Sequence, residues 1–248
     1  MKLNTVGTGK VVLIAGGGRC YTDIAARFVA SGRSVEDLIN EKYCPSIVKK
    51  ILGSGHLAAT EFDYFLFGVE GYSRITEVQL VRKRLASYMI SSGRSHIGKR
   101  EYSITVPQST IGFTYKNSNG EEKQVEDWVR EGELIYDSMV SAGIPEEDAR
   151  YYKLQATTFK GIIGMNAHAL RDWFRVRCCF RAQQEIRDMA TKMKNICMNV
   201  QPELFANCGA TCHELGYCPE NELQCDQKKG KVPTHADVLK MIKKGEWQ

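Results

Sequence analysis

The stretch on which the fold is organised is residues 79–94, which read QLVRKRLASYMISSGR. Three consecutive basic residues stand inside an otherwise apolar run, where a bare cation is costly to bury. Gln79, Arg82 and Lys83 recur at i, i+3 and i+4, so the spacing predicts a helix that presents them on one face. The following Ser-Ser-Gly-Arg segment offers hydroxyls, a glycine that lets backbone N–H groups approach an anion, and a further guanidinium.

Two interpretations fit this stretch. In the first, it is a cradle for a phosphorylated ligand, because permanent cations beside approachable backbone donors bind phosphate. In the second, it is a solvated basic helix face followed by an ordinary Ser/Gly turn. The chemistry of the residues alone does not separate the two.

Composition describes an ordinary globular protein. The chain has 248 residues, of which 43% are hydrophobic and 25% are charged, enough for one large or two small domains. The net charge of +5 suits an anionic small ligand and does not require nucleic acid as a partner. No apolar run approaches the ~20 residues of a membrane helix, and the N-terminus makes a poor signal peptide. We therefore expect a cytoplasmic protein that does not bind membranes.

Hydrophobic patterning predicts a mixed α/β protein. Short apolar runs bounded by turn residues predict strands at Lys10–Ala15, Phe62–Val69, Ser103–Pro107 and Thr157–Ile163. Amphipathic periodicity predicts helices at about Thr22–Ala30, Val125–Ala142 and, almost without interruption, Asn166–Met198. We expect a central sheet flanked by helices, with a long helical C-terminal half.

The basic stretch resembles the signature of the flavin-dependent thymidylate synthases, which carry Arg-His-Arg-x-x-Ser-x-Asn-x-x-Ser-x-Arg-Tyr. Five positions match with the spacing preserved: Arg82, Arg84, Ser87, Ser92 and Arg94. Three positions differ: Lys83 replaces the His, Met89 the Asn and Ser95 the Tyr. The resemblance extends over roughly residues 10–205, which implies a synthase-like domain at 1–205. Residues 206–248 are then a Cys-rich segment and a charged C-terminal tail.

The resemblance implies a deoxyuridylate (dUMP) site. The positions matched to that nucleotide are Gln79, Arg82, Ser92, Gly93, Arg94, Arg150 and Arg177. The resemblance also implies the catalytic role of Arg177: a guanidinium beside the uracil stabilises loss of the ring N3 proton and so raises electron density at carbon 5.

The resemblance also implies a flavin (FAD) site, which is less well preserved. Its matched positions are His56, Arg82, Lys83, Arg84, Asn166, His168, Asp172 and Arg181. Several positions matched to the flavin and folate differ from the family, at Ala58, Lys83, Ile90, His168, Asp172 and Arg181. The family's Arg has become His168 and its His has become Arg181, so these two changes could compensate each other. Lys83 either favours the anionic reduced flavin or points to solvent or another subunit.

What the resemblance implies about activity is reductive methylation of dUMP to dTMP. Methylenetetrahydrofolate supplies the carbon, and FAD reduced by NADPH supplies the hydride. The family is homotetrameric, with active sites at subunit interfaces. Two alternatives remain open: flavin-dependent methylation of another pyrimidine nucleotide such as UMP, and a nucleotide-binding relative without catalysis.

Nine cysteines are many for an intracellular chain, in which thiols are normally reduced. Four of them, Cys208, Cys212, Cys218 and Cys225, cluster near the C-terminus. Four thiolates form a normal tetrahedral zinc set, but the paired C-x2-C spacing is missing. The cluster therefore predicts either a structural zinc site or thiols that are unligated or joined in a disulfide.

Overall fold

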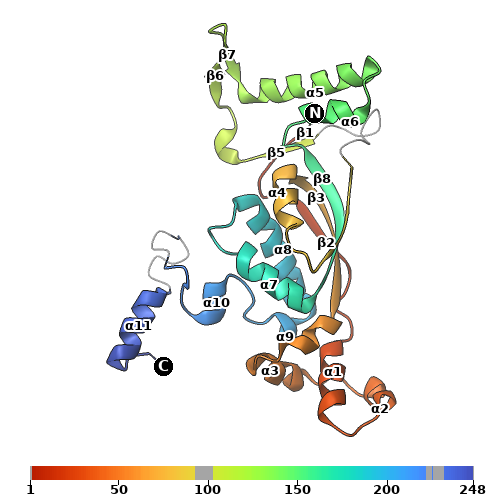
Figure 1. The fold of residues 1–248 in the computed structure, drawn as a ribbon, viewed down its shortest axis with the longest axis vertical. Coiled ribbons are helices and arrows are strands. Elements are labelled where there is room, and N and C mark those ends of the chain that lie inside the picture. Colours follow the sequence, from red (N-terminus) through yellow and green to blue (C-terminus); the bar gives the residue numbers. More distant parts are fainter. Residues whose placement is uncertain (1, 93–102, 222–224, 226–231, 248) are drawn as a thin grey trace. The chain divides into compact units, whose positions relative to one another are not determined.

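The computed structural model describes residues 2–92, 103–221, 225 and 232–247 (Figure 1). The chain divides into two compact units, each assembled from separate segments of sequence. The first unit comprises Met1–Val12, Gly68–Arg84 and Tyr88–Ile163, and the second comprises Leu13–Phe67, Leu85–Ser87 and Gly164–Gln248. Two of the predicted nucleotide contacts, Gly93 and Arg94, lie outside the described residues.

A four-stranded sheet has the order β2-β3-β8-β4. Its strands are β2 (Lys10–Ala15), β3 (Tyr64–Ser73), β8 (Thr158–Asn166) and β4 (Ser87–Ile90). Neighbouring strands are distant in sequence, as in sheets whose strands are connected through helices. Gly164 in β8 leaves room for the Tyr64 side chain of β3, because a Cβ there would lie 2.5 Å from the Tyr64 hydroxyl.

Among its described residues, the first unit also contains two small sheets and three helices. Strand β1 (Lys2–Thr5) pairs in parallel with β5 (Ser103–Val106), and β6 (Thr114–Lys116) forms a hairpin with β7 (Glu122–Gln124). Its helices are α4 (Arg74–Leu80), α5 (Val125–Ser141) and α6 (Glu146–Ala149), with 3-10 turns at Gln108–Thr110 and Arg150–Tyr152.

The second unit is mainly helical. Its elements are α1 (Tyr21–Ala30), α2 (Val35–Asn40), α3 (Pro45–Gly53), a 3-10 turn at Leu57–Phe62, α7 (Ala167–Arg177), α8 (Gln184–Val200), α9 (Pro202–Phe205), α10 (Thr211–Leu215) and α11 (His235–Lys244). Helices α7 and α8 pack together. The rings of Phe65, Phe174 and Phe205 form an edge-to-face aromatic cluster in this core. The Phe205 ring centroid lies 5.2 Å from that of Phe65 and 6.1 Å from that of Phe174.

Helix α1 begins with a cap supplied from far along the chain. The carboxylate of Asp63 accepts from the backbone N–H of Tyr21 at 2.8 Å and of Thr22 at 2.9 Å. These are two of the orphan donors at a helix N-terminus. The buried Asp63 therefore fixes where α1 starts.

The predicted fold class is confirmed: sheets are flanked by helices, and the C-terminal half is largely helical. Two element predictions are wrong. The helix expected over Asn166–Met198 is interrupted between α7 and α8, and the helix that starts at Arg74 ends at Leu80 instead of continuing through the basic residues. Within the described residues, every helix is too short or too polar to span a bilayer.

Candidate functional site

The three basic residues of the signature lie in a turn, not on a helix. Helix α4 ends at Leu80, and strand β4 begins only at Ser87. The Tyr88 hydroxyl, 2.9 Å from the Leu80 carbonyl oxygen and 2.8 Å from that of Lys83, holds the turn closed. Burial raises the pKa of Tyr88 to about 12, so the phenol stays a donor at neutral pH.

This turn changes how the cations are presented. The expected common face of Gln79, Arg82 and Lys83 does not form, because the helix ends before the last two. Arg82 and Arg84 are exposed and Lys83 is half-buried. Gln79 is still helical and half-buried, with its amide nitrogen 3.3 Å from the Ile75 carbonyl oxygen. Gln79 therefore lies on the helix, whereas the basic residues Arg82, Lys83 and Arg84 lie in the turn that follows it.

Arg150 meets helix α4 at a cavity of about 280 Å³ within the first unit. Arg150 is exposed and opens the 3-10 turn after α6. The cavity is lined also by Arg74, Glu77 and Lys153. Two segments predicted to bind the same nucleotide are thus brought together, although about 70 residues separate them in sequence.

The charges around this cavity favour an anion. Arg74 and Glu77 form an ion pair; since Arg150 and Lys153 also line the cavity, its charged lining residues carry more positive than negative charge. Burial lowers the pKa of Lys153; the charge of Arg74 acts in the same direction, while Glu146 opposes it. The Lys153 ammonium lies 3.7 Å from the centre of the Tyr136 ring. An entering phosphate would be stabilised by these cations.

Two predicted flavin residues of the second unit, Asn166 and His168, lie at the start of α7. The Asn166 side-chain oxygen accepts from the Ala169 N–H at 2.8 Å and caps the helix. His168 Nδ1 lies 3.2 Å from Glu61 Oε1. Glu61 ends the segment that starts at His56, which is exposed. The structure therefore brings the His56–Glu61 segment beside the first turn of α7.

Two further flavin positions are held in ion pairs. Asp172 Oδ1 lies 3.2 Å from Arg175 Nη1, and Arg175 Nε lies 2.7 Å from Glu214. Arg181 Nη1 lies 2.5 Å from Glu220. The Asp172 pair lies within α7, and Arg175 extends it to Glu214 of α10. The Arg181 pair joins the loop after α7 to Glu220. Arg181 therefore contacts the C-terminal segment directly, and Asp172 is connected to it only through Arg175.

Arg177, the predicted catalytic residue, is the last residue of α7 and is half-buried. It lines a cavity of about 450 Å³ within the second unit. Arg181 and part of the C-terminal segment, including Cys212, line the same cavity. Positive charge and thiols thus share one concave surface.

The predicted four-cysteine set is not assembled. Cys208 is buried apart from the other three, where burial raises its pKa to about 11 and Arg171 partly opposes the rise. Arg171 also holds this part of the chain by donating to the Leu204 carbonyl oxygen at 2.5 Å. The other three thiols line the Arg177 cavity together with Cys179. In the part of the chain that the structure describes, no group of three or more His, Cys, Asp or Glu residues is arranged to hold a metal ion.

Comparisons with known proteins decide the family. Residues 13–203 match the family model described as thymidylate synthase complementing protein. A flavin-dependent thymidylate synthase from Nitratidesulfovibrio vulgaris is 35% identical over 209 residues, covering 82% of this chain and 84% of the relative. The chain belongs to the flavin-dependent thymidylate synthase family.

Other members support the same family. The flavin-dependent thymidylate synthase from Thermococcus onnurineus is 38% identical over 195 residues, covering 75% of this chain and 76% of the relative. Among solved structures, the UMP/dUMP methylase PolB from Streptomyces cacaoi bound with 5-Br dUMP has a TM-score of 0.66 at 19% identity. That match covers 83% of this chain and 95% of the other, and it shows that the fold is shared.

Two residues that sequence reasoning missed line these cavities. Arg74 follows the buried Ser73, which caps α4, and a cation at the first position of a helix is a weak signal because it opposes the helix dipole. Cys179 precedes the predicted cysteine cluster by 29 residues. Only the tertiary structure of this family member places it with Cys212.

Proposed function

We propose that the chain is a flavin-dependent thymidylate synthase, a methyltransferase that converts dUMP to dTMP. Methylenetetrahydrofolate is the carbon donor, and NADPH is the reductant of the bound FAD. The observation that carries this proposal is the meeting of Arg150 with helix α4 at one cation-lined cavity. Membership of the family supplies the reaction class.

The nucleotide is expected to bind through permanent cations and backbone donors. Arg150 and Arg94 would hold the phosphate, with Ser92 and Gly93 beside them, because guanidinium groups bind phosphate through paired hydrogen bonds. Gln79 and Arg82 would contact the nucleoside. Arg177 would favour loss of the uracil N3 proton by placing a fixed positive charge near the developing anion.

The residues of the second unit fit a flavin in part. His168 and Arg181 are partly exposed, whereas Asn166 already uses its oxygen as a cap and Asp172 is ion-paired. When bound, FAD would supply the hydride that this chain's side chains cannot. We propose that it is held by these residues together with His56, Arg82, Lys83 and Arg84.

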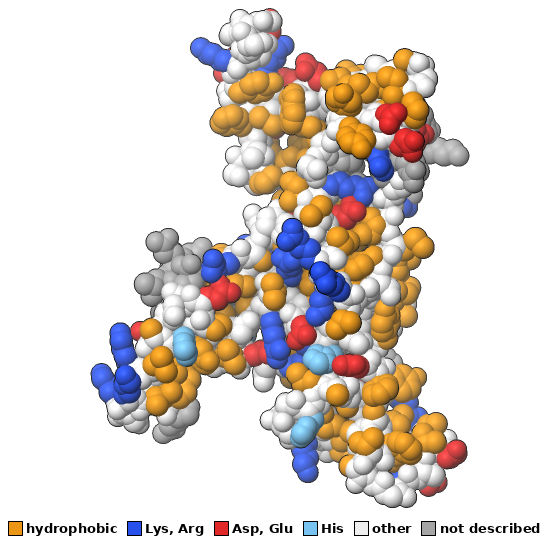
Figure 2. Space-filling view, in the orientation of Figure 1, with side chains coloured by type: hydrophobic (Ala, Val, Ile, Leu, Met, Phe, Trp, Pro, Cys, Tyr) orange, Lys and Arg blue, Asp and Glu red, His pale blue; other side chains and the backbone are white. Residues whose placement is uncertain are grey.

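We further propose a homotetramer in the cytoplasm, with synthase activity in a domain at 1–205. The support for assembly is an apolar groove of about 750 Å³ on α1 and its neighbours. Phe28 is 48% exposed, Val29 83% and Phe62 65%, and Figure 2 shows apolar side chains gathered in this region. Subunit packing would remove this surface from water. Light scattering measures the mass directly, and a monomer at micromolar concentration would refute the tetramer.

Zinc at the C-terminal cysteines stays a prediction. Cys212, Cys218 and Cys225 line one cavity with Cys179, but the described residues are not arranged as a metal site, so a bound ion would have to draw these thiols together. Elemental analysis of the purified protein tests it: about one zinc per chain, lost in Cys212→Ser with a lower melting temperature, is the expected result. Metal-free protein of unchanged stability and activity would exclude it.

A second candidate substrate is UMP. The changed flavin-side residues could accommodate a ribose hydroxyl, and the PolB neighbour is a methylase of both UMP and dUMP by its title. The decisive assay is tritium release from 5-labelled dUMP, and in parallel from UMP, with FAD, NADPH and methylenetetrahydrofolate. Release from dUMP alone supports the proposal, and release from UMP alone favours the second candidate. Nucleotide binding without release from either would show a non-catalytic relative.

A further inference from the structure

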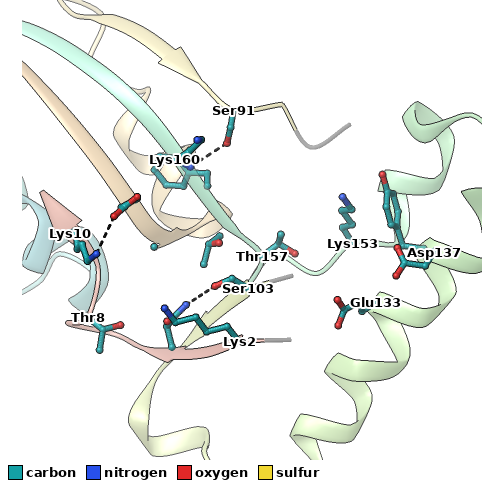
Figure 3. Close-up of a pocket in the computed structure, with 16 residues that line it drawn as sticks. Lys2, Thr8, Lys10, Ser91, Ser103, Glu133, Asp137, Lys153, Thr157 and Lys160 are labelled. Atoms are coloured by element: carbon teal, nitrogen blue, oxygen red, sulfur yellow. Dashed lines mark hydrogen bonds and ion pairs between the residues drawn. The ribbon is translucent and has the colours of Figure 1, made fainter. Parts of the chain in front are cut away.

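Ser91 lies between strand β4 and the predicted nucleotide contact Ser92. Three of its polar groups, the backbone N–H, the hydroxyl and the carbonyl oxygen, make hydrogen bonds. Its backbone N–H donates to the Lys160 carbonyl oxygen at 2.9 Å. Its hydroxyl oxygen accepts from the Lys160 N–H at 3.2 Å, as Figure 3 shows. Its carbonyl oxygen accepts from the guanidinium of Arg74 at 2.8 Å. Strand β8 and helix α4 therefore hold the same residue.

Arg74 is itself held in place. Its backbone N–H donates to the Thr157 carbonyl oxygen at 3.0 Å, and its guanidinium forms an ion pair with Glu77 one turn along α4. The side chain is only 21% exposed. A guanidinium presents five donors in one rigid plane, so it can hold a carboxylate and a carbonyl oxygen at once.

Helix α4 is also the element that carries Gln79, the predicted nucleotide contact that we place on the nucleoside. The Arg74 side chain thus joins the helix of the nucleoside contact to the segment of a phosphate-side contact, Ser92. We propose that Arg74 is a positioning residue that fixes the spacing between the nucleoside and phosphate subsites of the nucleotide site. This inference rests on the proposed function, since it assigns Arg74 a part in binding dUMP.

A direct contact between Arg74 and the phosphate is the competing explanation, because Arg74 lines the cavity that contains Arg150. The two roles differ in what they require of the side chain. Direct attraction needs only a cation, which lysine supplies. Positioning needs two hydrogen bonds in a fixed geometry, which a lysine ammonium on a flexible stem does not reproduce.

The experiment compares dUMP and deoxyuridine binding to the wild type and to three variants, Arg74→Gln, Arg74→Lys and Lys160→Gln. Lys160→Gln is the matched control, because it removes a nearby positive charge but leaves the backbone groups that hold Ser91. Calorimetry measures dUMP affinity, and ligand-observed NMR measures the weaker nucleoside. Flavin content and melting temperature report on folding.

We expect Arg74→Gln to weaken dUMP binding by about tenfold, at the usual size of a charge-assisted hydrogen bond. Arg74→Lys should lose nearly as much, while Lys160→Gln and the deoxyuridine affinity of all variants should change by less than about twofold. Full rescue by Arg74→Lys, equal losses for dUMP and deoxyuridine, or an equal loss in Lys160→Gln would overturn the positioning role.

If Arg74→Gln does not fold, Glu77→Gln provides a second test. This variant keeps Arg74 and removes the carboxylate with which it forms an ion pair. A smaller loss confined to dUMP supports the inference, and unchanged dUMP affinity overturns it. Wild-type protein that does not bind dUMP would refute the proposed function. Wild-type binding that survives in every Arg74 and Glu77 variant would refute the inference alone.

Discussion

The residues predicted to bind the nucleotide (the nucleotide side) and those predicted to bind the flavin (the flavin side) differ in how their side chains are engaged. On the nucleotide side, Arg150 and Arg82 extend from short turns as exposed cations, and the fixed elements are backbone groups such as those of Ser91. On the flavin side, His168, Asp172 and Arg181 are each paired with a carboxylate or guanidinium of the same unit. The first set is exposed, and the second is already paired within the protein.

The difference in side-chain pairing matches the positions at which this sequence departs from the family. The nucleotide positions keep the family's residue types, whereas Lys83, His168, Asp172 and Arg181 do not. Arg181 pairs with Glu220, and Asp172 pairs with Arg175, which in turn pairs with Glu214. Both glutamates belong to residues 204–248, which lie beyond the family match. The altered flavin side and the C-terminal segment are thus linked by ion pairs, and a change in one alters the environment of the other.

The largest expected effect separates chemistry from binding. Arg177→Ala should lower kcat by roughly 100-fold or more, as expected for loss of a preorganised charge near a developing anion. Binding of FAD should be retained, and tritium release under saturating substrate measures the effect. Arg175→Ala on the same helix is the control for general disturbance of α7, and equal losses in both variants would remove the special role of Arg177.

Arg150→Ala tests the nucleotide side. Removing a guanidinium that binds phosphate should weaken dUMP affinity by about tenfold or more, while flavin content stays constant. Arg130→Ala is the matched control: this exposed arginine of α5 pairs with Asp127 and lines neither of the cavities described above. Equal dUMP affinity in wild type and Arg150→Ala would contradict the assignment and weaken the comparison.

Lys83→Met tests the flavin side at the position where the signature is broken. A positive charge near the flavin pyrimidine stabilises its reduced anionic form, so the variant should have a reduction potential lower by roughly 30 mV for each tenfold loss of differential binding. Reduction by NADPH should slow, with dUMP affinity spared. Lys160→Met serves as the control, and an unaltered potential with flavin bound would show that Lys83 takes no part in the redox step.

The smallest effect concerns the cap of α7. Asn166→Ala should cost about 1 kcal/mol of unfolding free energy through loss of the helix cap, and should also weaken FAD binding. Ser34→Ala removes a comparable cap, since its hydroxyl accepts from the Asp37 N–H at 3.2 Å, and should spare FAD. Denaturant unfolding and flavin titration measure the two effects. Identical flavin affinity in both variants would leave Asn166 a purely structural residue.

Sequence reasoning predicted the regular elements well, because apolar periodicity is a local property. Strand β2 and helix α5 lie within one residue of their predicted bounds. The turn at Arg82–Arg84 was missed, since helical spacing in sequence cannot reveal that Tyr88, from the next strand, would hold two carbonyl groups. Side-chain hydrogen bonds from the following strand override the helical periodicity there.

The site was predictable to the extent that it resembles a family signature. The pairing of His168 with Glu61 and the position of Cys208 depend on contacts between segments far apart in sequence. No spacing rule gives such contacts. The hydrogen bond of Arg74, on which its proposed role rests, was not predictable for the same reason: its partner Ser91 becomes adjacent only when β4 pairs with β8.

The cap that Asp63 places on α1 has a consequence for how the chain acquires its structure. During synthesis, residues 21–30 leave the ribosome more than thirty residues before Asp63 does. Until then the first turn of α1 lacks its two carboxylate bonds, and a ten-residue helix is marginal alone in water. The same residue's carbonyl oxygen accepts from the Ala167 N–H at 2.7 Å. Ordering of the N-terminal helix is therefore tied to the arrival of α7, more than a hundred residues later in the nascent chain.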